Sequence, residues 1–149
     1  MTTAVILDTG GWLLALAGRA EYAAVLEETE LVWVPGLVLA EVDYHLRARR
    51  KDMWRLLEEI ERPPYQVEMP SQADLERARE IDRKFSQLDL GLVDASIVAL
   101  AERLEIHRVL TTDADFAVVR YGPRWNQGLT LAVPPALTPT ARKRRRRRI

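Results

Sequence analysis

Short apolar runs alternate with longer amphipathic segments along most of the chain. The run Ala4-Val5-Ile6-Leu7 ends at Asp8, and a continuous apolar run closed by a polar residue is typical of a strand buried on both faces. Comparable runs predict further strands at residues 31–34, 65–69, 107–111 and 129–133. Because strands that alternate with helices usually lie parallel, the pattern predicts an α/β fold whose parallel sheet is covered on both faces.

The amphipathic segments between these runs predict helices. We place them at residues 12–17, 20–28, 36–49, 52–61, 71–85 and 93–104. Pro35 favours a helix start, because the N–H that it lacks would have no partner in a first turn. Ser71 and Asp74 resemble a capping pair at the start of a later helix.

Charge is divided unevenly along the 149 residues. Lys plus Arg and Asp plus Glu both number 22, but seven of the basic residues lie within Arg142–Ile149. Without these seven, positions 1–141 carry 15 basic and 22 acidic residues, a net charge of −7. This length is typical of one domain. We expect a folded domain over residues 1–135, followed over 136–149 by a Pro/Thr linker and an Arg-rich disordered tail.

Composition excludes several kinds of site. The chain has no cysteine, so it has no disulfide framework, thiolate metal site or cysteine nucleophile. Its two histidines, His45 and His107, are far apart in sequence, which argues against a histidine-rich metal site. The first residues lack the features of a signal peptide, and no apolar run approaches the roughly 18 residues that span a bilayer. We therefore expect a cytoplasmic protein without membrane contact.

Four acidic residues occupy positions where a carboxylate needs a compensating partner. Asp8 follows the first predicted strand and Asp113 follows the fourth. A parallel sheet would bring both to the edge where such sheets bind ligands. Glu41 and Asp94 lie within otherwise apolar segments, where an isolated buried carboxylate is costly.

Some of these acids also have a purely structural interpretation. A helix dipole favours an acid at the position of Asp94, and Asp113 lies in a Thr-Thr-Asp-Ala-Asp stretch that suits a turn. The apolar flanks of Asp8 and Glu41 make them harder to explain in this way. If all four carboxylates met, they would repel one another unless a divalent cation compensated them. Mg²⁺ or Mn²⁺ suits such oxygen ligands, and the chemistry that these ions predict is phosphodiester hydrolysis.

Four sequence blocks, taken in order, resemble a known family. They are Leu7-Asp8-Thr9-Gly10, Leu39-Ala40-Glu41-Val42, Leu92-Val93-Asp94-Ala95-Ser96 and Leu110-Thr111-Thr112-Asp113-Ala114-Asp115-Phe116. The chain resembles the PIN domain and, more narrowly, the VapC-type ribonuclease toxins of VapBC toxin–antitoxin modules, over residues 4–133. The resemblance implies a three-layer α/β/α sandwich with a central parallel sheet of about five strands, and a metal-dependent endoribonuclease activity.

The resemblance also implies roles for individual residues. Asp8, Glu41, Asp94 and Asp113 would form the catalytic acidic quartet that binds Mg²⁺ or Mn²⁺. Thr111 would supply a hydroxyl that supports these ligands, and Phe116 would be a packing aromatic. Asp115 would be an auxiliary metal ligand or a helix cap, and we favour the cap. Gly10 departs from the family pattern, because a serine often stands at this position.

Candidate RNA contacts follow the predicted helix that carries Glu41. They are Arg47, Arg49, Arg50 and Lys51, which would hold phosphates near the metal. The alternative is a solvated helix end that favours cations through its dipole. The Arg-rich tail would add nonspecific affinity for RNA or have no function. The four tryptophans, Trp12, Trp33, Trp54 and Trp125, are more typical of core or interface positions than of base stacking.

With the resemblance, the sequence predicts a Mg²⁺- or Mn²⁺-dependent endoribonuclease that is the toxin of a type II toxin–antitoxin pair. Its substrate would be tRNA, rRNA or mRNA. Its partners would be a small VapB-like antitoxin and a second copy of the chain in a homodimer. Two alternatives stay open: a PIN-domain nuclease for RNA maturation that has no antitoxin, and a noncatalytic RNA- or protein-binding module.

Overall fold

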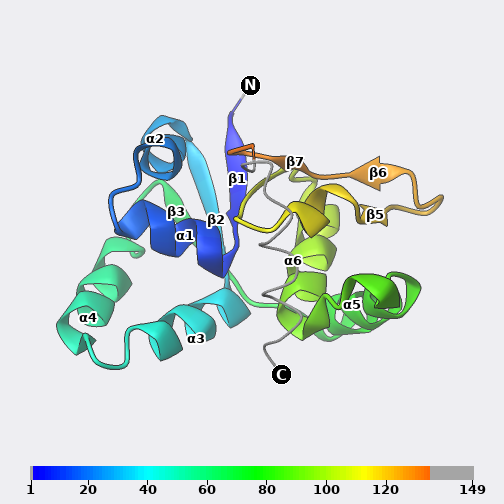
Figure 1. The fold of residues 1–149 in the computed structure, drawn as a ribbon, viewed down its shortest axis with the longest axis horizontal. Coiled ribbons are helices and arrows are strands. Elements are labelled where there is room, and N and C mark those ends of the chain that lie inside the picture. Colours follow the sequence, from blue (N-terminus) through cyan, green and yellow to red (C-terminus); the bar gives the residue numbers. More distant parts are fainter. Residues whose placement is uncertain (1, 135–149) are drawn as a thin grey trace.

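The strands predicted from the apolar runs form one parallel sheet in the computed structural model of the chain, which describes residues 2–134 (Figure 1). The sheet contains β1 (Ala4–Leu7), β2 (Leu31–Pro35), β3 (Tyr65–Glu68), β4 (Arg108–Leu110) and β7 (Thr130–Leu131), in the spatial order β3-β2-β1-β4-β7. Every pairing in this sheet is parallel. The predicted fold class is therefore confirmed. The predicted tail at 136–149 lies outside the described residues.

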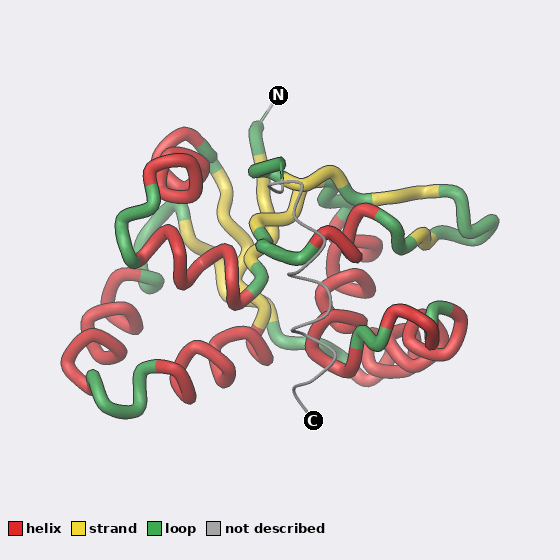
Figure 2. Tube along the Cα trace, viewed as in Figure 1, coloured by secondary structure: helices red, strands yellow, loops and turns green. Residues whose placement is uncertain are grey.

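Helices connect the strands and cover the sheet. They are α1 (Thr9–Leu16), α2 (Ala20–Glu28), α3 (Gly36–His45), α4 (Arg50–Glu59), α5 (Gln72–Lys84) and α6 (Gly91–Leu104), with short 3₁₀ turns η1 (Ser86–Leu88) and η2 (Ala114–Ala117). The helices α1 to α4 gather on one side of the strands, and α5 and α6 lie on the other (Figures 1 and 2). Over residues 2–134, no helix has both the length and the apolar character to cross a membrane.

The strand β1 forms the centre of the core because it pairs along both edges. Ile6 lies opposite Trp33 in β2 and opposite Val109 in β4. Val5, Ile6 and Leu7 are completely buried. A strand with both faces covered has no polar face to alternate with an apolar one, which explains the continuous apolar run.

The helix α6 is buried around its whole circumference from Ala95 to Ala101. Such burial is expected for a helix that is apolar on every side. It packs against both β1 and α5. Because α6 leads into a strand that is parallel to β1, it runs back along the sheet, and its first turn lies toward the carboxyl ends of the strands.

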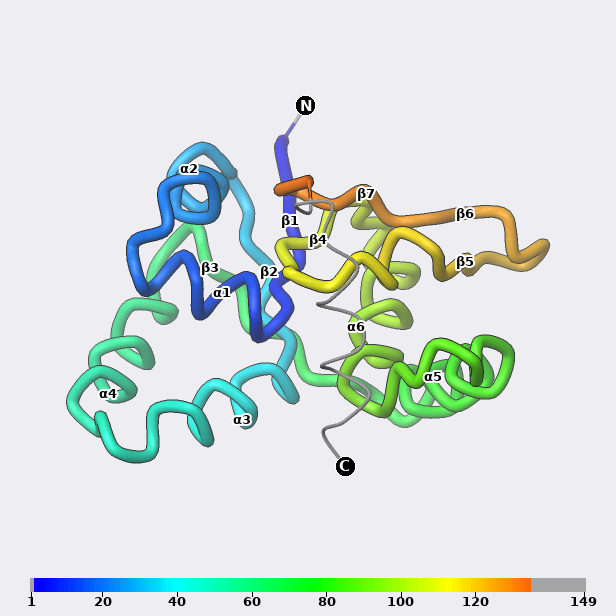
Figure 3. Tube along the Cα trace, viewed as in Figure 1, coloured from blue at the N-terminus to red at the C-terminus, as the bar shows by residue number. Residues whose placement is uncertain are grey.

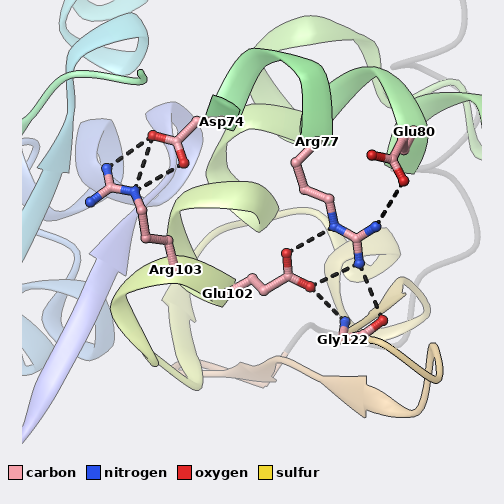
Figure 4. A network of polar contacts seen from close by, with 6 residues as sticks. All are labelled: Asp74, Arg77, Glu80, Glu102, Arg103 and Gly122. Atoms are coloured by element: carbon pink, nitrogen blue, oxygen red, sulfur yellow. Dashed lines mark hydrogen bonds and ion pairs between the residues drawn. The ribbon is translucent and has the colours of Figure 1, made fainter. Parts of the chain in front are cut away.

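An ion pair fastens α5 to α6 (Figure 4). The guanidinium of Arg103 donates to Asp74 from Nη2 at 2.9 Å and from Nε at 3.0 Å. The same carboxylate accepts from the Ser71 N–H at 2.8 Å, and the Ser71 hydroxyl accepts from the Asp74 N–H at 3.1 Å. The predicted capping pair is thus confirmed. Burial would raise the pKa of Asp74, but the hydrogen bonds from Arg103 and Ser71 outweigh it and hold this pKa below 3.8.

A second ion pair ties the same two helices to the loop after β5 (Figure 4). Arg77 donates to Glu102 from Nε at 2.8 Å and from Nη2 at 2.9 Å. Glu102 also accepts from the Gly122 N–H at 2.7 Å. Burial opposes ionisation of Glu102, yet the hydrogen bonds from Arg77 and Gly122 lower its pKa below 4.5.

A small antiparallel hairpin, β5 (Arg120–Tyr121) and β6 (Gln127–Gly128), was not predicted from the sequence. Strands of two residues are too short to show an alternating pattern. In the loop between them, Trp125 has a positive φ of 53°. Arg77 Cζ lies 4.4 Å from the centroid of this indole ring, and Lys84 Nζ lies 4.8 Å from it, so cation–π contacts join the hairpin to α5.

The helix predicted for residues 36–49 is too long, because α3 ends at His45. Leu46 departs from helical geometry, with φ of −99° and ψ of 19°, and its side chain is buried. Across the turn that follows, Arg50 Nη2 donates to Asp43 Oδ1 at 2.7 Å. A buried leucine and an ion pair stabilise this turn, and hydrophobic periodicity does not reveal either contact.

We expect Arg103→Met to lower the free energy of unfolding by about 1 to 3 kcal/mol near neutral pH, because it leaves the buried Asp74 carboxylate without its cation. Asp74 binds its proton more weakly in the folded chain than in the unfolded chain. Its contribution to stability is therefore present above pH 3.8, the ordinary pKa, and is lost as the pH falls below that value.

Urea unfolding between about pH 7 and about pH 3 measures both effects. The wild type should lose stability steeply on acidification, and Arg103→Met should show a smaller slope. Arg79→Met is the matched control, since it removes an exposed arginine from α5. Equal stability of the two variants at neutral pH would contradict the role given to the ion pair.

Candidate active site

Asp8 lies where β1 passes into α1, at the carboxyl edge of the sheet. Its backbone N–H donates to the Leu110 carbonyl at 2.9 Å, which extends the β1–β4 pairing by one residue. Its carboxylate accepts from the Thr9 N–H at 2.8 Å and from the Thr111 hydroxyl at 2.5 Å. Asp8 is the N-cap of α1 and is 7% exposed. This buried carboxylate is therefore fixed by donors from two segments that are far apart in sequence.

Thr111 connects Asp8 with the segment that carries Asp113. Its hydroxyl donates to Asp8 Oδ2 and accepts from the Asp113 N–H at 3.0 Å. Figure 3 shows the end of β1, in blue, beside the segment after β4, in yellow. The structure thus brings Asp8 and Asp113 to one edge of the sheet.

Glu41 reaches this edge from α3. That helix begins directly after β2, at Gly36, so its first turns lie beside the carboxyl ends of the strands. The Thr9 hydroxyl donates to Glu41 Oε1 at 2.5 Å. Because Thr9 follows Asp8 in the chain, one short turn contacts two of the other three segments that carry candidate acids.

Asp94 belongs to α6, a helix of the layer opposite α3 (Figure 1). It lies in the first turn of α6, toward the carboxyl edge, and is 7% exposed. The positive end of the helix dipole stabilises a carboxylate in this position. The fourth candidate acid therefore lies toward the same edge as the other three.

Two glycines allow α1 to approach the end of β4. A Cβ atom at Gly11 would overlap the Leu110 carbonyl group, which is backbone and cannot rotate away. The absence of this atom lets the start of α1, and with it Asp8, lie against β4. A Cβ atom at Gly10 would lie 2.6 Å from the Thr112 hydroxyl oxygen. The Thr112 hydroxyl thus occupies the space that the Cβ atom of a serine at position 10 would need.

The expectation that Asp115 caps a helix is wrong, because Asp113 holds the capping position. Asp113 Oδ1 accepts from the Asp115 N–H at 2.9 Å, at the start of η2. Asp115 is itself buried, and its role as an auxiliary metal ligand stays a prediction. Phe116, the expected packing aromatic, is completely buried.

The donors at this edge suit a hard divalent cation. All four candidate ligands are carboxylates, which favour Mg²⁺ and Mn²⁺ over softer metals. Between residues 2 and 134, no three Asp, Glu or His side chains form a preassembled group that could hold a metal ion. Mg²⁺ does not require such a group, because one or two carboxylates commonly bind it while waters and substrate phosphates complete its shell. The chemistry of the donors therefore fits these ions, and the assignment of individual ligands stays a prediction.

The four predicted RNA-binding residues, Arg47, Arg49, Arg50 and Lys51, lie in and after the turn that joins α3 to α4. Arg49 pairs with Asp52 at 2.6 Å and Arg50 pairs with Asp43 at 2.7 Å, so part of their charge is neutralised. Arg47 and Lys51 are exposed. The guanidinium of Arg47 lies over the Tyr44 ring, 5.5 Å from its centroid.

Three of the four tryptophans occupy core positions. Trp12 is completely buried, and Trp33 and Trp125 pack against the core. Trp54 lies outside the core, because it is 57% exposed on α4, and an interface role for it stays a prediction.

A comparison with models of protein families identifies the family of this chain. The PIN domain model matches residues 5–120, a range that includes all four candidate acids. The chain belongs to the PIN domain family. PIN domains are typically metal-dependent nucleases, in agreement with the oxygen donors at the carboxyl edge. No curated protein matches the chain in sequence.

Solved structures with a similar PIN-like fold include toxins and toxin–antitoxin complexes. VapC20 from Mycobacterium tuberculosis, a sarcin-ricin loop cleaving toxin, has a TM-score of 0.67 at 21% identity, over 76% of this chain and 93% of that one. A toxin–antitoxin complex from Klebsiella pneumoniae gives a TM-score of 0.64 at 22% identity, over 76% and 90%. VapBC2 from Rickettsia felis, bound to a DNA fragment from its promoter, gives 0.62 at 17% identity, over 86% and 98%. At these identities the likeness shows a shared fold.

The sequence did not identify Thr9, Gly11 and Thr112 as residues that shape the carboxyl edge of this PIN domain. Each acts through a contact with a segment that is distant in the chain. The one local signal was the Gly10-Gly11 pair two residues after the first acid, because adjacent glycines allow a close approach of the backbone.

We expect Gly11→Ala to lower the free energy of unfolding by about 1 to 3 kcal/mol, because the new methyl group must push α1 away from β4. Gly10→Ala is the matched control. Its methyl group meets the end of an exposed threonine side chain, which can turn aside, and alanine favours the helix by up to about 1 kcal/mol. Urea unfolding compares the variants, and equal destabilisation by both substitutions would contradict the close backbone approach at Gly11.

Proposed function

We propose that this PIN domain is a Mg²⁺- or Mn²⁺-dependent endoribonuclease that hydrolyses phosphodiester bonds in RNA and acts as the toxin of a type II toxin–antitoxin pair. The observation that carries the proposal is the pair of hydroxyl contacts at the carboxyl edge. The Thr111 hydroxyl donates to Asp8 and the Thr9 hydroxyl donates to Glu41, so that three separate segments that carry candidate acids meet at this edge. Family membership and the similar fold of VapC toxins support the same activity.

Asp8, Glu41, Asp94 and Asp113 would hold the metal, with Asp115 as an auxiliary ligand. A bound Mg²⁺ or Mn²⁺ ion would supply a coordinated water of lowered pKa and stabilise negative charge on the scissile phosphate. The Thr111 hydroxyl orients the Asp8 carboxylate by donating to Oδ2. The Thr9 hydroxyl orients Glu41 in the same way. Carboxylates whose orientation is fixed in advance lose little entropy when they bind an ion.

Cationic side chains must offset the repulsion between RNA and an acidic edge. Arg47 and Lys51 are the best candidates, because Arg49 and Arg50 already share their charge with carboxylates. A VapB-like antitoxin would cover the edge and bring an Arg or Lys side chain to the acids, since such a cation replaces the charge of the metal. The complexes from Klebsiella pneumoniae and Rickettsia felis support a partner of this kind. A homodimer and a cytoplasmic location belong to the same proposal.

Two alternatives predict different observations. An RNA-maturation nuclease would cleave RNA with the same metals but would have no antitoxin, so a neighbouring reading frame for a small DNA-binding protein separates it from a toxin. A noncatalytic module would bind RNA or protein without cleavage, and EDTA would not affect its binding.

We expect Asp8→Asn to reduce RNA cleavage about 100-fold or more, because it removes a negatively charged ligand at the centre of the edge. The fold should survive, since asparagine caps helices as well as aspartate does. A mixed RNA pool incubated with Mg²⁺, Mn²⁺ or EDTA provides the measurement. Glu105→Gln is the matched control, because this exposed carboxylate lies at the opposite end of α6 from Asp94. Undiminished cleavage by Asp8→Asn would contradict the assignment.

We expect Thr111→Val to weaken Mn²⁺ binding about 10- to 100-fold, because valine has nearly the same shape but cannot orient Asp8. Titration calorimetry with Mn²⁺ alone measures this effect without reference to RNA cleavage. Thr130→Val removes an exposed threonine hydroxyl from β7 and should leave the affinity unchanged. A wild-type affinity for Thr111→Val would exclude the orienting role.

A further inference from the structure

We infer that Tyr44, with Arg47 over its ring, forms a stacking site for one base of a single-stranded RNA next to the acidic edge. This inference rests on the proposed function, because it assigns a binding site for the same class of substrate. It concerns the last turn of α3 and the residues just after it. This segment lies outside the four sequence blocks and carries none of the candidate acids.

The position of Tyr44 on α3 connects it with Glu41. Residues three apart on a helix lie on neighbouring parts of one face, and three residues advance about 4.5 Å along the axis. Stacked nucleotides repeat at about 3.4 Å along a strand. A base on Tyr44 would therefore lie one to two nucleotides from a phosphate at the Glu41 carboxylate.

The environment of Tyr44 suits stacking. Its side chain is 65% exposed, the most exposed of the large hydrophobic side chains in the described part of the chain. His45 meets the ring edge to face, with the centroids 6.0 Å apart and the planes at 84°. A ring that neighbouring side chains hold in place and leave open to solvent is a platform on which any base can stack.

Arg47 supplies the matching charge. It forms no ion pair with the residues described, whereas Arg49 and Arg50 pair with carboxylates. Its guanidinium lies over Tyr44, from where it can meet a phosphate or stack on a base. Four of the 15 basic residues of positions 1–141 fall between 47 and 51, in a region that otherwise has an acidic excess. An aromatic ring among cations favours a polyanion with flat bases over a protein surface.

The test measures binding of the full chain to a single-stranded RNA oligomer that carries one 2-aminopurine, whose fluorescence falls when the base stacks. EDTA is present, so that binding is read without cleavage. We expect Tyr44→Leu to bind about 5- to 150-fold more weakly than the wild type and to abolish the fluorescence loss. Tyr44→Phe, which keeps the ring, should bind and quench as the wild type does.

Arg47→Ala tests the cation against Arg83→Ala, which removes an exposed arginine from α5 and changes the net charge equally. We expect a larger loss of affinity for Arg47→Ala. Urea unfolding of each variant shows that the fold is retained, as expected for exposed side chains.

The outcomes separate this inference from the proposed function. If the wild type cleaves RNA with Mg²⁺ or Mn²⁺ but Tyr44→Leu binds and quenches normally, the stacking site is overturned and the nuclease stands. If Tyr44→Leu leaves RNA binding intact and changes the oligomeric state instead, the surface is a protein interface and the inference is wrong. If the wild type neither binds nor cleaves RNA, both proposals fail.

Discussion

The contact between the end of β1 and the end of β4 determines both the sheet and the candidate site. The Asp8 N–H completes the pairing with Leu110, and the Asp8 carboxylate accepts the Thr111 hydroxyl one residue further on. The backbone of Asp8 thus completes the pairing at the centre of the sheet, and the hydrogen bond to its side chain fixes the position of the first acid. Gly11 makes this possible by leaving no Cβ atom between α1 and β4. A change that separates these segments therefore disturbs stability and the acidic edge together.

Polar contacts between distant segments hold the remaining helices in position. Burial opposes ionisation of Asp74 and Glu102, but their arginine partners more than compensate for it. These two ion pairs lie on the α5–α6 side of the sheet. The helices α3 and α4, which carry the exposed Tyr44 and Trp54, lie on the other side (Figures 1 and 4). Internal ion pairs therefore stabilise the α5–α6 side, whereas the α3–α4 side carries an exposed arginine, Arg47, that forms no ion pair with the described residues.

Much of the fold could be predicted from the sequence because local patterns encode it. The apolar run of β1 reflects burial on both faces, and the capping pair of Ser71 and Asp74 indicates the start of α5. The candidate acids could be placed at one edge because parallel strands share a direction. Contacts between distant segments could not be predicted in this way. The buried Leu46 and the Arg50–Asp43 ion pair stabilise the turn after α3, and the Thr9 hydroxyl orients Glu41. Such contacts exist only after the chain has folded.

The order of these segments in the chain also matters during synthesis. Asp8 and Glu41 leave the ribosome before Thr111 and Asp113 do. Closing the long loop between β1 and β4 is entropically unfavourable until the intervening helices have packed. A nascent chain therefore carries separate carboxylates rather than an assembled acidic edge. The proposed nuclease therefore gains its complete acidic edge only after the segment that carries Thr111 and Asp113 has been translated.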